Sequence, residues 1–402
     1  MRVVIAPDSF KECLGAGEVA AAIASGVVKA APDAVIDICP MADGGEGTVA
    51  AIVAATAGRF ITADVFDPLG RQIRAKFGLL GEGPVAALPG EVGLAAGLAQ
   101  QGDSACECDG CAAVVEMAAA SGLELTPPGM RDPLWTTTFG TGQLITAALD
   151  AGARSIILGV GGSATVDGGA GCLQALGVVF IDGAGNPCRC GMGGGALCDV
   201  ASIDVSGMDK RVRPGLITVA ADVTNPLTGP QGAARVYGPQ KGATPEAVEQ
   251  LERGLEHFRK LVADLLGIDM NAISGAGAAG GLGGGIAAFT GAKISAGLGV
   301  IAEAVNLRQR ISCADLVITG EGKLDASSAF GKTAVGVARM AGELGVSAVC
   351  IPGQVGAGAP RELFAAVLPL VGDGVTPAQA IESAPAVLEL RARQAMAKYI
   401  KG

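Results

Sequence analysis

Acidic residues, most of them close to glycine, recur along this sequence directly after short apolar runs. The loops that carry them read PDSFKE, DGGEGT, GGSATVDGG, ADVTN and TGEGKLD, and begin at residues 7, 43, 161, 221 and 319. Glycine lets backbone N–H groups approach an anion closely, and a helix that starts after the loop adds the positive end of its dipole. Carboxylates beside a bound phosphate need an intervening cation, and Mg²⁺ binds carboxylates together with phosphate oxygens. The combination predicts a site for phosphoryl transfer.

The elements that position these loops alternate between strands and helices. Strand patterns are RVVIA, VIDICPMA, SIILGV, LITVAADV and ADLVITGEG, and helical periodicity follows at AGEVAAAIASGVVKAA, TVAAIVAATAG and TAVGVARMAGELG. This alternation predicts an α/β fold with a mainly parallel sheet. Because ligands bind at the carboxyl ends of the strands in such sheets, we expect the acidic loops to converge there.

The length and one change of pattern indicate two domains. A chain of 402 residues exceeds one ordinary hydrophobic core. From Phe60 onward, FITADVF and IRAKFGLL flank the turn sequence PLGR, which predicts a β-hairpin. Antiparallel strands inside a βα chain favour an inserted second domain. A long amphipathic helix is also predicted at TPEAVEQLERGLEHFRKLVADLLGI, capped by Thr244.

Charge and hydropathy limit the classes of partner that this protein can bind. The net charge of −10 repels a phosphodiester backbone, so we expect no nucleic-acid partner. A small anion can still bind, because local cations and backbone N–H groups outweigh the global charge over a few ångströms. No apolar run reaches the roughly 18 residues of a membrane-spanning helix, and the N-terminus lacks the layout of a signal peptide. We therefore expect a cytoplasmic protein without a membrane partner, and leave open whether it is a homodimer.

The cysteines and the single histidine offer weaker alternatives. Eleven cysteines include two groups with metal-ligand character: Cys106, Cys108 and Cys111, and then Cys188, Cys190 and Cys198. Together they could hold a metal, although we interpret them as loop cysteines of a cytoplasmic chain. His257 lies in the long helical pattern, which argues against a Ser-His-Asp triad.

The familiar nucleotide motifs are incomplete. FGKT at 330–333 ends like a P-loop, but Ala326 stands where the P-loop needs glycine. Gly275, Gly277 and Gly280 spell GxGxxG without a convincing strand before them. An NAD(P)-dependent dehydrogenase acting on a small 2-hydroxy acid is therefore an alternative, though a disfavoured one. A ligand sensor without catalysis is a second alternative.

Taken in order, the loops resemble the bacterial class I glycerate kinase family. The matching segments are VIAPDSFKE, PMADGGEGT, VVEMAAASGLEL, TTTFGTGQLI, GVGGSATVDGGAG, DVTNPLTGPQGA, VYGPQKGAT, GAGAAGGLGGG and ADLVITGEGKLD, from residue 4 to about residue 336. The resemblance implies phosphorylation of D-glycerate by ATP to 2-phosphoglycerate, with 3-phosphoglycerate as an alternative product. It also implies a flavodoxin-like parallel-sheet domain, a large inserted α/β domain and an active site in the cleft between them. We place the first domain at residues 1–62 and 293–402 and the inserted domain at 63–292.

Roles for individual residues follow as hypotheses. Lys11 is the first candidate to hold the glycerate carboxylate and Lys241 the second, and Asp43 or Asp167 is expected to accept the proton of the attacking hydroxyl. Mg²⁺ is expected on Asp222 or Asp325. Other residues expected to bind substrate or phosphate are Ser9, Thr141, Gly161, Gly162, Ser163, Asn225, Gly320, Gly322 and Lys323.

Two departures from the family pattern stand out. Residues 88–112, which contain CECDGC, look like an insertion, and we interpret them as a surface excursion from the inserted domain. Val166 stands where the family often has asparagine, so a hydrogen bond from that position is lost. The neighbouring Asp167 keeps a role in binding metal or substrate open.

Overall fold

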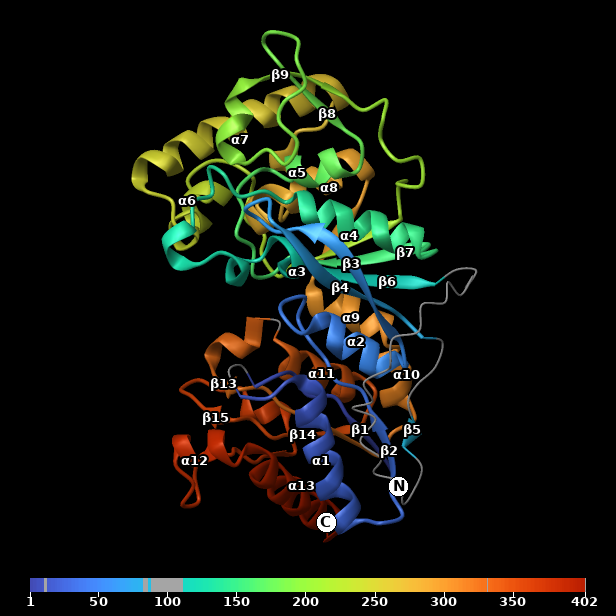
Figure 1. Ribbon diagram of the computed structural model, residues 1–402. Coiled ribbons are helices and arrows are strands. Elements are labelled where there is room, and N and C mark those ends of the chain that lie inside the picture. Colours follow the sequence, from blue (N-terminus) through green and yellow to red (C-terminus); the bar gives the residue numbers. More distant parts are fainter. Residues whose placement is uncertain (11–12, 82–85, 88–110, 331, 402) are drawn as a thin grey trace.

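The structure is a computed structural model that describes residues 1–10, 13–81, 86–87, 111–330 and 332–401. Within these residues the strands form two six-stranded sheets and two small two-stranded ones. The large sheets occupy the lower and upper halves of the molecule in Figure 1, and both termini lie in the lower half. The expected α/β class with largely parallel sheets is confirmed.

The lower sheet is parallel except at one edge. Its spatial order is β16-β14-β12-β1-β2-β5. The strands are β1 (Arg2–Ile5), β2 (Val35–Ile38), β12 (Leu316–Thr319), β14 (Ser347–Cys350), β16 (Ala366–Val367) and the antiparallel β5 (Ala86–Ala87). Numbered along the chain, the five parallel strands are ordered 2-1-3-4-5. Apolar residues on both faces of β1 are buried, which fits a sheet covered on both sides.

Helices cover both faces of this sheet. On one face Val3 and Ile5 pack against α1 (Ala16–Ala30) and α13 (Ala384–Lys401), with α12 (Pro377–Glu382) beside them. On the other face lie α11 (Thr333–Glu343), α10 (Leu307–Ser312), α9 (Gly297–Ala304) and α2 (Thr48–Thr56). The helices expected after the first two strands and near the C-terminus are confirmed.

The upper sheet combines four parallel strands with the predicted hairpin. Its order is β11-β10-β7-β6-β4-β3. The parallel strands are β6 (Ala112–Glu116), β7 (Ser155–Gly159), β10 (Ile217–Ala220) and β11 (Lys293–Ser295), and the antiparallel ones are β3 (Arg59–Phe66) and β4 (Gln72–Leu79). One face is covered by α3 (Ala118–Ser121), α4 (Phe139–Asp150) and α8 (Leu282–Thr290).

A further layer lies above the upper sheet. It contains α5 (Ala170–Ala175), α6 (Ala233–Tyr237), α7 (Pro245–Leu266) and the hairpin of β8 (Val179–Asp182) and β9 (Val200–Asp204). The cap predicted for α7 is present, because Thr244 Oγ1 accepts a hydrogen bond from the N–H of Ala247 at 3.2 Å. His257 on this helix bonds through Nε2 to the carbonyl of Val200 at 2.6 Å, so it is occupied within the fold.

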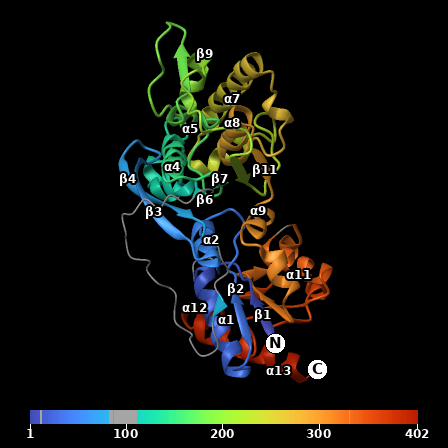
Figure 2. The same ribbon diagram turned by 90° about the vertical axis from the view of Figure 1, so that its right-hand side faces the viewer.

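Helices α2 and α9 lie between the two large sheets, as Figure 2 shows from the side. Their buried residues, such as Ile52 and Ile301, belong to one hydrophobic cluster with Val317 of the lower sheet and Ile157 of the upper sheet. The strands of the upper sheet lie between Arg59 and Ser295, close to the expected insertion, although β5 within this range belongs to the lower sheet. The division into domains remains a prediction. Residues 88–110 of the expected excursion lie outside the described residues, and residue 112 already belongs to β6.

Within the described ranges, no helix is long and apolar enough to cross a membrane.

Candidate active site

The loop at residues 42–47 joins the carboxyl ends of the two large sheets. It follows β2 of the lower sheet, yet the carbonyl of Gly44 accepts a hydrogen bond from the N–H of Gly161, which follows β7 of the upper sheet, at 3.4 Å. Gly44 has φ of +90°, and a Cβ there would lie 3.0 Å from the carbonyl of Ala220. Only glycine fits this approach without strain. The expected convergence of loops thus occurs between two sheets rather than along one.

Asp8 of the lower sheet and Asp222 of the upper sheet both lie within range of the charge of Asp43, which belongs to this loop. Desolvation raises the pKa of Asp8 and of Asp222, and the nearby charge of Asp43 raises both further. The carboxylate of Asp222 accepts a hydrogen bond from the N–H of Gly297 at 2.8 Å, and that of Asp8 accepts one from Thr333 Oγ1 at 2.5 Å. A hard divalent cation prefers carboxylate oxygens as ligands. The chemistry of these side chains therefore suits the expected Mg²⁺, although their spacing does not form a ready cluster in the described part of the structure.

Glu321 extends this group and was not chosen as a site residue from the sequence. It is 5% exposed, and its Oε1 has no hydrogen-bond partner among the residues that the structure describes. Its Oε2 lies 4.0 Å from Lys332 Nζ. Burial raises the pKa of Glu321 to about 7, and the charge of Asp8 adds to the shift. The signal that could have found it was present, because Glu321 directly follows a buried strand.

Asp325, expected as a metal ligand, is an ionised carboxylate that already pairs with side chains of its own loop. Lys323 Nζ lies 3.2 Å from its Oδ2, and Ser327 donates to its Oδ1 through both N–H and hydroxyl. The Ser327 hydroxyl and then Lys323 lower the pKa of Asp325 to about 2. The same pair occupies Lys323, expected to bind phosphate. Gly320 and Gly322 hold neighbouring loops, since their carbonyls accept from the N–H groups of Asp8 and Gln354.

Lys241 forms a second polar centre beneath the glycine pair at 161–162. It is 2% exposed, and its Nζ donates to Ser163 Oγ at 2.6 Å and to the carbonyl of Thr165 at 2.8 Å. Burial lowers the pKa of Lys241 to about 7, against the opposing effect of the Asp167 charge. The hydroxyl of Thr165 is buried without a partner. The loop therefore holds a buried amine beside a half-buried hydroxyl, an arrangement suited to an anion.

Asp167, one of two candidates for the base, is enclosed by the protein. Its carboxylate accepts hydrogen bonds from Thr138 N–H at 2.8 Å, Thr138 Oγ1 at 2.7 Å and Gly169 N–H at 3.1 Å. The residue is fully buried. It therefore joins the starts of α4 and α5 in the protein interior. The neighbouring Val166 packs in the apolar cluster under α7, where a buried amide side chain would be costly without a hydrogen-bond partner.

The remaining residues predicted for the site lie in different parts of the protein. Thr141 Oγ1 donates to Ser121 Oγ at 2.7 Å in the interior. Asn225 donates to the carbonyl of Gln231 in its own loop and accepts from the hydroxyl of Tyr237 at the end of α6. The N–H of Ser9 donates to the Asp8 carboxylate at 2.6 Å. Lys11, predicted to hold the substrate carboxylate, lies outside the described residues.

The alternative motifs find other uses. A Cβ at Gly277 would lie 2.3 Å from the carbonyl of Pro226, and one at Gly280 would lie 2.0 Å from that of Thr165, so these glycines serve close packing. Cys106 and Cys108 are outside the described residues, and Cys111, Cys188, Cys190 and Cys198 are free thiols. In the described part of the chain, no three His, Cys, Asp or Glu side chains form a preformed metal cluster. The carboxylates above would have to draw together around a bound cation.

Comparison with known proteins adds an independent finding. Residues 3–400 match the model of the glycerate kinase family. A glycerate kinase of Bacillus subtilis is 47% identical, covering 88% of this chain and 85% of its own. The glycerate 2-kinase of Escherichia coli is 46% identical, covering 85% and 82%. A crystal structure from Salmonella typhimurium LT2, of a protein assigned as glycerate kinase 2, superposes with a TM-score of 0.85 at 44% identity, covering 100% of this chain and 99% of that one.

Proposed function

This chain belongs to the glycerate kinase family, and from that premise we propose that it phosphorylates D-glycerate with ATP, giving 2-phosphoglycerate and ADP. The observation that carries the proposal is that Gly297 donates to Asp222 while its Cα approaches the carbonyl of Asp43, so acidic loops from both sheets adjoin there. Phosphoryl transfer depends on positioning and on charge neutralisation more than on covalent chemistry by the protein. A carboxylate group that fits Mg²⁺, flanked by glycine loops, suits that task.

The two lysines of the site, Lys241 and Lys332, suggest where each of the two substrates binds. Lys241 with Ser163 offers one buried amine, which suits the single carboxylate of glycerate. Lys332 is the N-cap of the 11-residue helix α11, and its Nζ lies 4.0 Å from Oε2 of Glu321, the residue between Gly320 and Gly322; this cationic helix start suits the nucleotide phosphates. Lys332 takes the place that Lys323 had in the prediction, because Lys323 pairs with Asp325.

Within this arrangement Asp43 accepts the proton of the reacting hydroxyl. Asp222 would hold Mg²⁺, which supplies positive charge to the phosphoryl oxygens when it is bound. The order 2-1-3-4-5 of the lower sheet supports a flavodoxin-like domain with the upper sheet inserted into it. We also expect the enzyme to act in the cytoplasm, and its assembly as a homodimer remains a prediction.

The function is tested by ³¹P NMR of the products formed from ATP, Mg²⁺ and D-glycerate. We expect the resonance of 2-phosphoglycerate to grow together with that of ADP. A 3-phosphoglycerate resonance would contradict the assigned position. Consumption of NAD(P) in place of ATP would favour the dehydrogenase alternative.

The role of Asp43 has its own test. Asp43→Asn keeps an oxygen that can accept from the N–H of Gly45, as Asp43 Oδ1 does at 3.1 Å, but it cannot take a proton. We expect kcat to fall by about 10² or more. A variant with near wild-type kcat would remove Asp43 from the role of base.

A further inference from the structure

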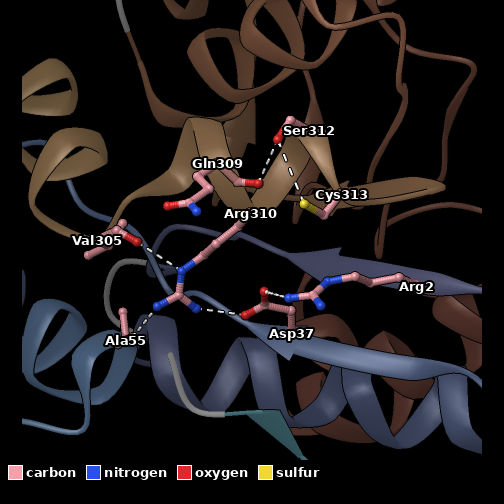
Figure 3. A network of polar contacts seen from close by, with 8 residues as sticks. All are labelled: Arg2, Asp37, Ala55, Val305, Gln309, Arg310, Ser312 and Cys313. Atoms are coloured by element: carbon pink, nitrogen blue, oxygen red, sulfur yellow. Dashed lines mark hydrogen bonds and ion pairs between the residues drawn. The ribbon is translucent and has the colours of Figure 1, made fainter. Parts of the chain in front are cut away.

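Arg310, on α10, makes an unusually complete set of contacts far from the carboxylates (Figure 3). Its Nε donates to the carbonyl of Val305 at 2.8 Å, and its Nη2 donates to the carbonyl of Ala55 at 2.6 Å. Its Nη1 donates to Asp37 Oδ1 at 2.6 Å. The residue is 7% exposed, so all three directions of the guanidinium are used inside the protein.

Two of these contacts are the ends of the two helices that lie between the sheets. Ala55 is in the last turn of α2, and Val305 directly follows α9. A cation at a helix C-terminus offsets the negative end of the helix dipole and pairs carbonyls that have no partner within the helix. One guanidinium therefore fixes the ends of both helices relative to each other.

The third contact anchors this junction to the lower sheet. Asp37 lies in β2 and is 2% exposed, and its other oxygen accepts from Arg2 Nη2 in β1 at 2.7 Å. Because a buried carboxylate is costly without partners, Asp37 holds Arg310 firmly in place. The network thus joins four segments: β1, β2, α2 and the α9–α10 junction.

The opposite ends of the same two helices meet the candidate active site. The first turn of α2 follows the Asp43 loop, and its N–H at Val49 donates to Glu116 of the upper sheet at 2.6 Å. The first residue of α9, Gly297, donates to Asp222, and a Cβ on it would lie 1.8 Å from the carbonyl of Asp43. A shift of either helix along its axis would therefore move Asp43 and Asp222 relative to each other.

We infer that Arg310 is a positioning residue for this site: by clamping the C-terminal ends of α2 and α9 to the lower sheet, it sets the separation of Asp43 and Asp222. The inference rests on the proposed function for the use of that separation, which is to set the base Asp43 against the metal ligand Asp222. It concerns a residue that touches neither substrate nor metal. A misplacement of about 1 Å at a reacting centre can cost roughly 10² in rate, which makes such a clamp consequential.

Arg310→Lys tests this, because one ammonium cannot reach the three acceptors that the planar guanidinium serves. Hydrogen exchange of the metal-free protein should quicken about tenfold or more at the amides of α2 and α9. Mn²⁺, used as a probe for Mg²⁺ and followed by its EPR signal, should bind about tenfold more weakly. Asp37→Asn, which keeps an oxygen acceptor for Arg310, is a milder second variant and should weaken Mn²⁺ binding in the same direction.

The matched control is Arg391→Lys. Arg391 is 4% exposed and its Nη1 pairs with Asp373 at 2.8 Å, but it lies on α13, on the outer face of the lower sheet. This variant should quicken exchange around α13 and leave Mn²⁺ binding unchanged. If Arg310→Lys and Asp37→Asn loosen α2 and α9 but bind Mn²⁺ as tightly as the wild type, the inference is overturned. Wild-type protein that binds Mn²⁺ without phosphorylating D-glycerate would refute the proposed function alone.

Discussion

At the scale of single residues, two ionisable groups of the site, Glu321 and Lys241, have pKa values shifted from their ordinary values. Among the described residues, Glu321 has a buried oxygen without a partner, and Lys241 is enclosed with two acceptors. Both groups have pKa values near neutrality, displaced by burial in opposite directions. Such displacements are typical of functional sites.

Glu321→Gln should stabilise the protein while lowering its activity. The pKa of Glu321 is about 7 in the folded state against 4.5 in the unfolded state, so the folded state binds more protons between these pH values. Its contribution to stability is present below pH 4.5 and is lost as the pH rises to 7. Above pH 7 the variant should exceed the wild type in unfolding free energy by up to about 3 kcal/mol. Urea titrations at pH 5 and pH 8 measure this, and equal curves at pH 8 would contradict it.

Lys241→Met tests a dependence of stability on pH with the opposite sign. The pKa of Lys241 is about 7 in the folded state and 10.5 in the unfolded state, so the unfolded state binds more protons in that window. The unfolding free energy of the wild type, measured relative to the variant, should therefore rise as the pH increases from 7 to 10. Lys260→Met, on the exposed face of α7, should follow the wild-type curve. If the difference in unfolding free energy between the wild type and Lys241→Met does not change with pH, the pKa of Lys241 is not shifted in the folded state.

At the scale of elements, the contact between α9 and the Asp43 loop leaves no room for a side chain. Gly297→Ala would set a Cβ 1.8 Å from the carbonyl of Asp43, so the helix must move away from the site. We expect a loss of about 1–3 kcal/mol of stability together with weaker metal binding. Chemical denaturation and Mn²⁺ titration measure the two effects.

Gly299 in the same helix provides the control for this substitution. It is exposed, and a Cβ there would have nothing within 4 Å. Gly299→Ala should therefore raise stability by about 0.5–1 kcal/mol through the better helix propensity of alanine. If both variants had the same stability and the same Mn²⁺ binding, the close approach of Gly297 to the Asp43 loop would not matter for the site.

Local patterns predicted most of these elements, while the site needed contacts across the chain. The hairpin around PLGR, the capped helix from Pro245 and the strands before the acidic loops all follow from periodicity and turn residues. Nothing local indicated that Gly44 of one sheet would pack against Ala220 of the other, because that approach depends on how the sheets pack. For the same reason Asp167 and Asp325 looked equivalent to Asp43 and Asp222 until their partners were known.

At the scale of the whole molecule, the shared layer of α2 and α9 predicts one cooperative unfolding transition. Ile52 and Ile301 pack in a cluster that includes residues from both large sheets, so neither sheet keeps a complete core without the other. Differential scanning calorimetry should give a calorimetric enthalpy equal to the van't Hoff enthalpy. Ile52→Ala, a truncation of a fully buried side chain, should lower the single transition temperature without splitting it. Two resolved transitions would contradict the shared core.

The same layer restricts the way in which the two sheets can move. Two domains joined by exposed linkers can move apart about a hinge, but here the connections are packed helices whose C-terminal ends both contact Arg310, and α9 contacts Asp222 at its other end. Packed helices move by small shear steps. We therefore expect any movement between the two sheets to shift α2 and α9 by short steps, and so to change the spacing of Asp43 and Asp222.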